Sequence, residues 1–543
     1  MLLRCSFVLM FFISLNASVL SYEEIKKEPK SLAKDYYIYR LITETKYDKN
    51  EIKELKKDIF RNKGKLQTQI DKILPPFKKQ DNCNGIGSKN ILDANLSCKL
   101  ARMFPNFIKS ISQGDREALI KEFASRADLI NLLQGYNQKN PAKYYAKTQN
   151  AKNFFIYYNS INQQEQDDKF NFALEPEFAQ TLATKGYFKT FVVNSVLQKK
   201  HEVLTKSLLE LNTTVLSDDS AFFLGLQALK FNKPKKANEL FFQAKTTYKK
   251  QFDKDKSSFW MYQTSKDINL LKELSNSQNI NIYSLYAKEM TGNNQVEVVI
   301  PQPTKKSVKG YDSSDPFAWV KLKEKVKTLD LKNLEKYADK FDTKNTVGEY
   351  IYIANILSGY KDNFYPMPFM DYLKDTNIHR RALIFALARQ ESRFVQSAVS
   401  TSYALGMMQF MPFVANDIAK KNKLKDFDQD EMFKPEVAYK FANIHLDWLE
   451  RYLYNPVFIA YAYNGGLGFT KRTLLRGDLF NDGKYEPFLS MELVPVQESR
   501  EYAKHVLANY VIYLQALSVE SNTSILTLLK TLTIPSLSDS FRK

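Results

Sequence analysis

The sequence has few of the residues that interrupt helices. Glycine and proline supply only 17 and 18 of its 543 residues, whereas Tyr (32) and Phe (38) are abundant. Long stretches therefore lack turn signals, which argues against the short, Gly- and Pro-punctuated strands of β proteins. We expect a mostly α-helical protein with two to four domains, because 543 residues exceed what one hydrophobic core usually supports.

Cysteine is also scarce, with three residues. Cys5 lies near the N-terminus, and Cys83 and Cys98 are 15 residues apart around a turn-rich segment, CNGIGSKNILDANLSC. A disulfide between Cys83 and Cys98 is predicted if the chain reaches an oxidising compartment. Two unpaired structural cysteines remain the alternative.

Only the N-terminus carries a long apolar run. Residues 1–21 contain Arg4, an apolar stretch and then small residues, with Val19 and Ser21 at the −3 and −1 positions of a cleavage site. This pattern is typical of a secretory signal peptide, so we predict an exported chain with no membrane span after cleavage. An uncleaved anchor is the alternative, although the run is shorter than the roughly 20 residues that a span needs.

Histidine is almost absent, and its positions show no ligand spacing. His201, His379, His445 and His505 are scattered, and neither a Cys/His finger nor an aromatic-basic RNA-binding strand occurs. We therefore expect no metal, no cofactor and no nucleic-acid partner. The net charge of +19 would attract anionic polymers or lipid, but a solvated basic surface explains it equally well.

The remaining sequence divides by texture. Residues 22–292 read as successive amphipathic helices, and 220–245 has the spacing of one tetratricopeptide-like helix pair. Such pairs bury their apolar faces by stacking, so we predict an α-solenoid. A Pro-, Gly- and Ser-containing linker (293–316) leads to a helical linker domain (317–360). Glycines and short motifs then cluster in 361–543, where chemistry is expected.

One carboxyl occupies an unusual position in that last region. In the run RALIFALARQESRF, Ile384, Leu387, Ala388 and Glu391 lie at i, i+3, i+4 and i+7, so Glu391 extends an apolar stripe. A carboxylate there is costly unless it is paired or protonated. Desolvation would raise its pKa, which suits a general acid.

An ion pair is the alternative explanation for Glu391. Arg389 and Arg393 are close enough in sequence to neutralise a glutamate at the end of the helix. Glu391 is, however, the one acidic residue between positions 376 and 416. Any acid chemistry performed by this segment therefore has a single local carboxyl.

Two further motifs follow Glu391. GMMQFMP (406–412) combines a turn glycine, thioethers, an aromatic ring and the amide of Gln409 before Pro412, a natural first-turn residue of a helix. This composition suits the wall of a sugar site, although Met407 and Met408 would equally fill a core. AYNGG (462–466) ends an apolar helix at glycine.

The order of these motifs resembles the soluble lytic transglycosylases of the bacterial envelope. The resemblance rests on Glu391-Ser392, on Gly-x-Met-Gln 15 residues later, on Ala-Tyr-Asn-Gly about 70 residues later and on VPVQESREYAKHVL near the end. It implies a periplasmic enzyme with an N-terminal α-superhelical domain and a C-terminal lysozyme-like α domain (361–543). The implied activity is cleavage of the β-1,4 bond between N-acetylmuramic acid and N-acetylglucosamine in peptidoglycan glycan strands.

The resemblance also assigns roles. Glu391 is implied to be the catalytic acid and then the base, and the residues implied to bind substrate are Ser392, Ser400, Gln409, Met411, Tyr463, Asn464 and Glu498. The sequence departs from the family pattern at Tyr403, Leu405 and Met407, where smaller residues or leucine are common. The bulk of Tyr403 leaves the shape of the active-site loop open.

A single carboxyl fits this chemistry. Most glycosidases need two carboxyls, whereas here the 6-hydroxyl of muramic acid attacks its own C1 and forms a 1,6-anhydro ring. A hydrolytic muramidase remains an alternative because water could attack instead. A non-catalytic envelope scaffold, with glycan on the lysozyme-like domain and envelope proteins on the solenoid, is the other.

Overall fold

The computed structural model describes residues 19–76, 83–198, 201–293, 295–518 and 524–542 of the chain. The predicted signal peptide lies outside these residues except for its last three positions. Within them the protein is helical, with isolated β-bridges and no β-sheet. The prediction of a mostly α-helical fold is therefore confirmed. None of the described helices is both long and apolar enough to cross a lipid bilayer.

The chain divides into two compact units, and each contains segments that are distant in sequence. Unit 1 comprises residues 1–76, 296–476 and 501–543, and unit 2 comprises 77–295 and 477–500. The helices before residue 76 thus group with the C-terminal motifs. The domain boundaries predicted from the sequence remain predictions.

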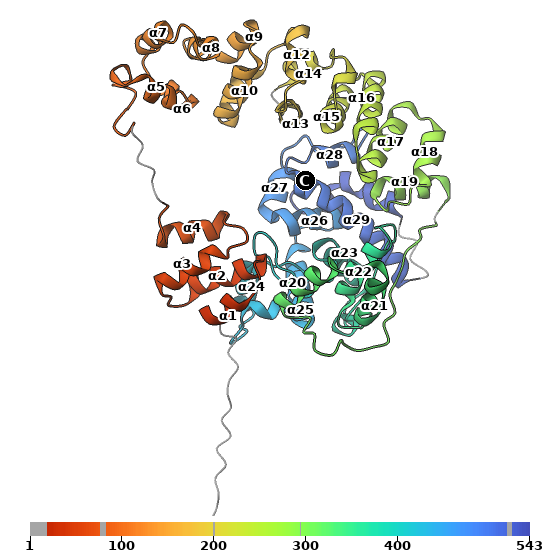
Figure 1. Ribbon diagram of the computed structural model, residues 1–543. Coiled ribbons are helices and arrows are strands. Elements are labelled where there is room, and N and C mark those ends of the chain that lie inside the picture. The colour runs from red at the N-terminus through yellow and green to blue at the C-terminus, as the bar shows by residue number, and fades with distance from the viewer. Residues whose placement is uncertain (1–18, 77–82, 199–200, 294, 519–523, 543) are drawn as a thin grey trace, which may run out of the picture. The chain divides into compact units, whose positions relative to one another are not determined.

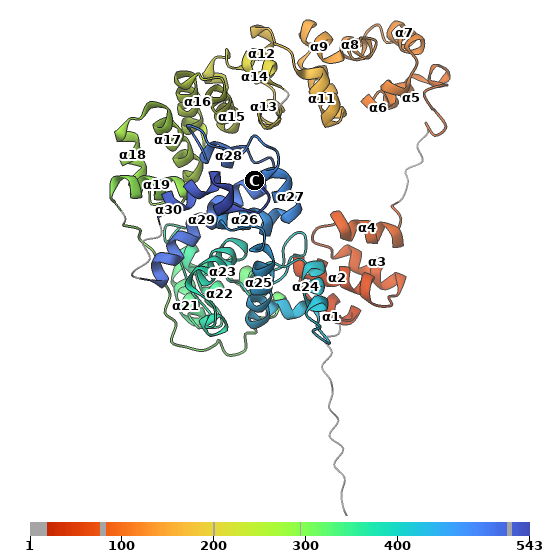
Figure 2. The same ribbon diagram turned by 180° about the vertical axis from the view of Figure 1, so that it is seen from behind.

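Unit 2 is a row of short helices in which neighbours in sequence pack on one another (Figures 1 and 2). Its helices are α5 (Leu96–Arg102), α6 (Pro105–Ser110), α7 (Gln113–Glu122), α8 (Ala127–Tyr136), α9 (Pro141–Lys147), α10 (Ala151–Ser160), α11 (Gln163–Phe170), α12 (Pro176–Ala183), α13 (Phe188–Leu197), α14 (Glu202–Leu208), α15 (Asp218–Lys230), α16 (Pro234–Thr247), α17 (Gln251–Ser265), α18 (Ile268–Ser275), α19 (Ile282–Thr291) and α28 (Phe488–Leu493), with 3-10 turns η1 (Ile91–Asp93) and η2 (Thr213–Val215).

The helix pair expected over 220–245 forms α15 and α16. Gly225 on α15 lies so close to Phe241 on α16 that an added Cβ would meet the ring at 2.5 Å. Ala228 and Ala237 are fully buried beside it. Small residues on one helix and a ring on the other therefore allow the two helices to approach closely.

The last segment of unit 2 returns to the row from far along the chain. Helix α28 packs on α17 and α19, where the rings of Phe488 and Phe259 are 4.3 Å apart. The buried Glu492 accepts hydrogen bonds from the indole of Trp260 and the phenol of Tyr283. Sequence periodicity does not indicate this return.

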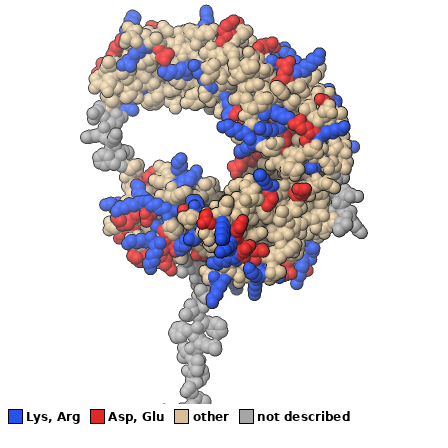
Figure 3. All heavy atoms as spheres, turned by 45° about the vertical axis from the view of Figure 1, so that its right-hand side comes forward, with Lys and Arg blue, Asp and Glu red and all other residues tan. Residues whose placement is uncertain are grey.

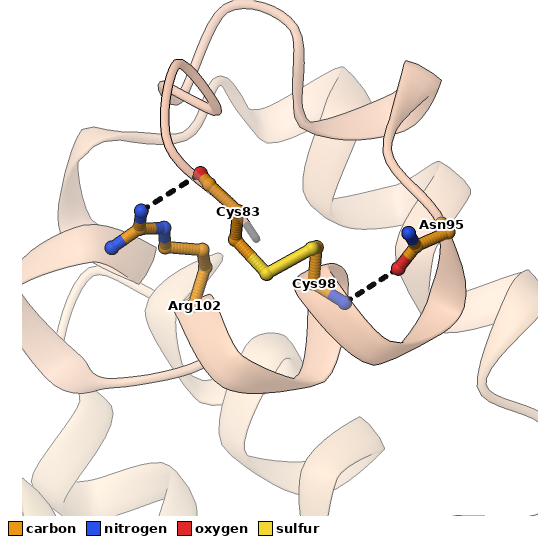
Figure 4. The surroundings of a disulfide bond; sticks show 4 residues. All are labelled: Cys83, Asn95, Cys98 and Arg102. Carbon is orange, nitrogen blue, oxygen red and sulfur yellow. Dashed lines mark hydrogen bonds between the residues drawn. A yellow bond between two sulfur atoms is a disulfide. The ribbon is translucent and has the colours of Figure 1, made fainter. Parts of the chain in front are cut away.

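A disulfide joins Cys83 and Cys98 at the start of unit 2 (Figure 4). The side chain of Asn95 caps α5 by accepting from the amide of Cys98 at 2.9 Å. Arg102, one turn further along α5, donates to the carbonyl of Cys83 at 2.9 Å. The disulfide and the arginine thus attach the preceding loop to the same helix.

Unit 1 is assembled from three stretches of the chain. Its helices are α1 (Tyr22–Lys27), α2 (Leu32–Glu44), α3 (Lys49–Lys57), α4 (Gly64–Ile73), α20 (Pro316–Val326), α21 (Leu331–Phe341), α22 (Val347–Leu357), α23 (Ile378–Glu391), α24 (Pro412–Lys421), α25 (Pro435–Leu449), α26 (Pro456–Gly465), α27 (Leu467–Leu474), most of α29 (Gln497–Leu517), α30 (Ile525–Lys530) and α31 (Pro535–Ser538), with 3-10 turns η3 (Met370–Leu373), η4 (Gln429–Phe433) and η5 (Thr531–Thr533).

The surface shows both signs of charge. On the face displayed in Figure 3, Lys and Arg side chains are interspersed with Asp and Glu side chains. Mixed charges of this kind weaken one another's fields at a distance. On this face, therefore, the net positive charge does not by itself mark a binding site for a polyanion.

Candidate active site

Helix α23 carries Glu391 at its C-terminal end. The helix begins at Asn377, whose side chain accepts from the amide of Arg380 at 2.9 Å. Residues 382–388 are all buried, so the middle of the helix is enclosed on every side. The sequence predicted an apolar stripe on one side of this helix, whereas the middle of the helix is buried on all sides. Glu391, three residues after this buried part, is partly exposed. A buried helix of this kind fixes the position of the carboxyl.

Tyr502 on α29 is the hydrogen-bond donor to that carboxyl. Its hydroxyl donates to Oε1 of Glu391 at 2.6 Å, and its side chain is only 6% exposed. Burial and the charge of Glu391 raise the pKa of Tyr502 well above its ordinary value, which keeps the phenol protonated as a donor. Tyr502 was not among the predicted site residues, although it lies within the quoted motif VPVQESREYAKHVL. The pattern that could have indicated it is a tyrosine on the apolar face of the last long helix, four residues before the buried Val506.

Tyr463 on α26 lies close enough to Glu391 to be affected by its charge and forms a hydrogen bond to the neighbouring loop. Its hydroxyl donates to the carbonyl of Met408 at 2.9 Å. Burial, and then the charge of Glu391, raise the pKa of Tyr463 well above its ordinary value. Two neutral phenols therefore lie within electrostatic reach of Glu391, and Tyr463 also holds the backbone of the loop. Asn464, the next residue, is partly exposed at the end of α26.

Three other residues predicted to bind substrate hold the loop over 398–411. The hydroxyl of Ser392 donates to the carbonyl of Met407 at 2.8 Å. The amide of Gln409 donates to the carbonyls of Ala398 at 3.1 Å and Gly406 at 2.7 Å. Ser400 accepts from backbone amides within the same loop. The structure thus gives these three side chains a shaping role, and Oε1 of Gln409 forms no hydrogen bond within the described part of the chain.

The thioether cluster separates into core and surface residues. Met407 and Met408 are buried, which agrees with the alternative that they fill a core. Met411 is partly exposed as the residue that precedes α24. The ring of His445 lies 5.6 Å from that of Tyr463, and burial lowers the pKa of His445 to about 4, so this imidazole is neutral.

Tyr403, the bulky departure in the loop, is a packing residue. It is 4% exposed, and its ring lies 5.9 Å from Tyr36 and 5.7 Å from Tyr39 of α2. The ammonium of Lys65 lies 4.5 Å from the ring centroid, in a cation–π contact. Residues near the N-terminus of the chain therefore support the outer side of the loop.

An arginine on α2 supports a second segment next to the loop. Arg40 forms ion pairs with Asp428 at 2.7 Å and Asp430 at 2.9 Å, and Asp430 also accepts from Tyr36 and Tyr37. Asp428 directly precedes η4, and Asp430 lies within it. Its Met432 carbonyl lies so close to Gly406 that a Cβ would collide with it, and Gly406 has φ +75°.

Glu498, the last residue predicted to bind substrate, lies in a different unit from Glu391, so its place in the site remains a prediction. It is exposed in the first turn of α29 and belongs to unit 2, whereas Glu391 belongs to unit 1. Within the described ranges, no group of three His, Cys, Asp or Glu side chains is placed to hold a metal ion.

The segment that carries this site is similar to a domain of known proteins. Residues 370–482 match the transglycosylase SLT domain. This segment contains Glu391, the loop with Ser400 and Gln409, and Tyr463. The match does not extend to Tyr502 or Glu498.

Named relatives are similar over less than a third of the chain. A Haemophilus influenzae protein assigned to the soluble lytic murein transglycosylases is 32% identical over 164 residues, which are 30% of this chain and 27% of that protein. The soluble lytic murein transglycosylase of Salmonella typhimurium is 28% identical over 167 residues, 30% of this chain and 25% of the relative. The chain thus spans about a quarter of the length of these curated relatives.

Solved structures are similar over a larger fraction but at lower identity. The 70 kDa soluble lytic transglycosylase of Escherichia coli is 16% identical, with a TM-score of 0.48 over 93% of this chain and 83% of that chain. The lytic transglycosylase of Pseudomonas aeruginosa is 16% identical, with a TM-score of 0.47 over 90% and 74%.

Proposed function

We propose that this protein is a peptidoglycan lytic transglycosylase that cleaves the β-1,4 bond between N-acetylmuramic acid and N-acetylglucosamine and leaves 1,6-anhydro-N-acetylmuramic acid ends. The observation that carries the proposal is the position of Glu391. It is a single carboxyl at the end of a buried helix within the SLT segment, and it accepts a hydrogen bond from Tyr502. A lone carboxyl suits a reaction in which the substrate supplies the nucleophile.

The mechanism uses Glu391 twice. The protonated carboxyl donates its proton to the glycosidic oxygen, and the bond between that oxygen and C1 of muramic acid breaks. The carboxylate then takes the proton from the 6-hydroxyl of muramic acid, and the oxygen of that hydroxyl forms the new bond to C1. Tyr502, kept neutral by burial, stabilises the carboxylate between the two steps.

The loop and the end of α26 supply the sugar contacts in this proposal. Oε1 of Gln409 accepts from a sugar hydroxyl or N-acetyl amide, and Met411 provides an apolar surface for a ring face. Asn464 and Ser400 lie at the partly exposed edges of the same region. Glu498 would contact the sugar from the far wall. The enzyme acts in the periplasm after removal of residues 1–21.

Replacing Glu391 tests the proposal. Glu391→Gln keeps the shape and the hydrogen bond from Tyr502 but has no proton to give, so cleavage of purified peptidoglycan should fall by about 1,000-fold or more. Glu436→Gln is the matched control, because Glu436 is exposed in the first turn of α25. Its activity should equal that of the unaltered protein.

Mass spectrometry of the released fragments separates the alternatives. Anhydro ends support the transglycosylase, whereas reducing ends would show a hydrolytic muramidase. Binding of peptidoglycan without any cleavage by the unaltered protein would favour the scaffold. Full cleavage by Glu391→Gln would remove Glu391 from the mechanism.

A further inference from the structure

Unit 1 contains a second cavity, of about 360 Å³, that no step above uses. It lies among the start of α2, helices α20 and α22 and the first residues of the active-site loop. We call it the Trp319 pocket and define it by Lys30, Phe60, Trp319, Lys323, Tyr352 and Ser397. Its walls come from three separate parts of the sequence.

The pocket holds a buried hydroxyl without a partner. Ser397 is fully buried, and its Oγ forms no hydrogen bond within the described residues. Buried polar groups are almost always satisfied by protein or by a ligand. Because Ser397 is among the residues that line the cavity, a small rotation of this side chain would give its hydroxyl a partner in a molecule bound there.

An unpaired ammonium lines the same cavity. Lys323 lies 5.1 Å from the ring centroid of Trp319 and forms no ion pair within the described ranges. Burial, and then repulsion from Lys327, lower the pKa of Lys323. By contrast, Lys327 pairs with Glu324 at 2.7 Å, and Lys30 pairs with Asp58 at 3.7 Å. Lys323 is thus the ammonium of this pocket that forms no ion pair with a described residue, although the charge of Glu324 acts on its pKa in the opposite sense to that of Lys327.

The other walls combine apolar side chains with Glu324 and Lys327, which form an ion pair with each other, and the apolar part is firmly held. The rings of Trp319 and Tyr352 meet edge to face at 5.0 Å. Phe60 is 61% exposed, yet its backbone amide donates to the buried carboxyl of Asp35 at 2.8 Å. A large exposed ring on a fixed backbone is available to cover an apolar ligand group.

We propose that the Trp319 pocket binds a carboxylate attached to a small alkyl group, as at the C-terminal residue of a short peptide. The carboxylate pairs with Lys323 and accepts from the hydroxyl of Ser397, and the alkyl group packs on Trp319. One ammonium and one hydroxyl suit the two oxygens of a carboxylate better than the three oxygens and greater charge of a phosphate.

Occupancy of the pocket would also reach the active-site loop. Ser397, Ala398 and Val399 line the cavity, and the carbonyl of Ala398 accepts from the side chain of Gln409 and from the amide of Gly406. A bound ligand would therefore restrain the same backbone that positions Gln409.

Calorimetric titration of the full chain tests the proposal with alanyl-alanine, its C-terminal amide, propionate and inorganic phosphate as probes. Alanyl-alanine should bind, and its amide should bind at least tenfold more weakly. Lys323→Met and Ser397→Ala should each weaken dipeptide binding by tenfold or more. The matched control is Lys325→Met, which removes an exposed ammonium from α20 outside the pocket. Unchanged unfolding midpoints show that the variants fold.

Each outcome decides the proposal. Equal binding of dipeptide and propionate supports the carboxylate site and assigns it to small acids, whereas tighter dipeptide binding assigns it to peptide ends. Binding of phosphate instead, equal binding of the amide, unchanged affinity in Lys323→Met, or no binding of any carboxylate would overturn it. Repeating the titration in Glu391→Gln separates this result from glycan cleavage, so the two proposals can fail independently.

Discussion

The two units of this protein are built by different kinds of contact. In unit 2, helices adjacent in sequence pack on one another, as α15 does on α16 and α16 on α17. In unit 1, the contacts around the site join distant residues: Tyr502 and Glu391 are 111 positions apart, and Tyr36 and Asp430 are 394 apart. The stability of a row of neighbouring helices is roughly the sum of local terms. The geometry of the site depends instead on a few long-range contacts.

This difference predicts where substitutions act. A substitution in a helix of unit 2 should destabilise the adjacent helices and leave the position of the Glu391 carboxyl unchanged. A change in a long-range contact of unit 1 should alter catalysis even where the substituted side chain does not reach the substrate. The predictions below are ordered by their expected effect on activity.

The hydrogen bond to Glu391 should matter most. Tyr502→Phe removes the donor and should lower the cleavage rate by about 10- to 100-fold, because a hydrogen bond to a charged group contributes about 1.5–3 kcal/mol. Since the donor stabilises the ionised carboxyl, its loss should move the high-pH fall of the rate to higher pH. Initial rates of peptidoglycan release between pH 4 and pH 9 measure both effects.

Tyr510→Phe is the control for that experiment. Tyr510 also lies on α29, but its hydroxyl contacts His379 at 2.9 Å. Its pH profile should match that of the unaltered protein. An identical displacement in both variants would show that loss of any phenol from α29 is sufficient.

Packing of α2 on the loop should matter next. Tyr403→Ala removes a buried ring and should lower the free energy of unfolding of unit 1 by about 3 kcal/mol. It should also lower kcat several-fold, because the loop that holds Gln409 loses its outer support. Tyr403→Phe should restore both, since the contacts with Tyr36 and Tyr39 are ring contacts.

Tyr360→Ala serves as the comparison, because Tyr360 is well exposed in unit 1. Denaturant titration and steady-state rates on soluble glycan are the measurements. If Tyr403→Ala lost stability while kcat stayed unchanged, the contact would be structural only.

A buried carboxyl in α22 should affect stability without affecting the chemistry. Glu349 is fully buried beside Tyr311, which donates to it at 3.1 Å, and burial raises the pKa of Glu349 to about 7 from 4.5. The folded chain therefore holds this proton more tightly than the unfolded chain. The protonated carboxyl stabilises the folded chain fully below about pH 4.5. This stabilisation is lost as the pH rises toward 7, so that above this range the free energy of unfolding is lower by about 3 kcal/mol.

Glu349→Gln should remove this dependence. The difference in unfolding free energy between the variant and the unaltered protein should therefore grow from pH 5 to pH 8. Denaturant titrations at both pH values measure it, with the exposed Glu335→Gln as the control. Parallel profiles for Glu349→Gln and the unaltered protein would contradict the prediction.

The disulfide of unit 2 should have the smallest effect on the site. Replacing Cys83 and Cys98 by serine frees a loop of 15 residues, which should destabilise unit 2 by about 3 kcal/mol. Cleavage at a temperature where unit 2 remains folded should be unchanged. Loss of activity without unfolding would show that catalysis depends on unit 2.

Local patterns were sufficient for part of the molecule. The spacing of Gly225, Ala228, Ala237 and Phe241 predicted α15 and α16, because facing positions of two adjacent helices lie close in sequence. The separation of Cys83 from Cys98 predicted their pairing for the same reason. Glu391 was proposed as the acid because it is the one acidic residue between positions 376 and 416 and because its motif resembles that of a known family.

Other parts required the folded chain. No periodicity connects Tyr502 with Glu391, and none indicates that Tyr403 would lie between side chains of α2. The expected apolar stripe ending at Glu391 also needed correction, since Glu391 is a partly exposed residue and the helix before it is buried over residues 382–388 on every side.

By itself the sequence determined the helical fold and the adjacent helix pair, and it predicted the disulfide and the carboxyl on which the proposed chemistry depends, because each appears in a short stretch of the chain. Only the tertiary structure decided which phenol donates to that carboxyl, what supports the loop beside it and where Ser397 and Lys323 share a cavity. Those choices depend on contacts between segments 50 to 400 positions apart, whose free energy comes from the packing of the whole unit.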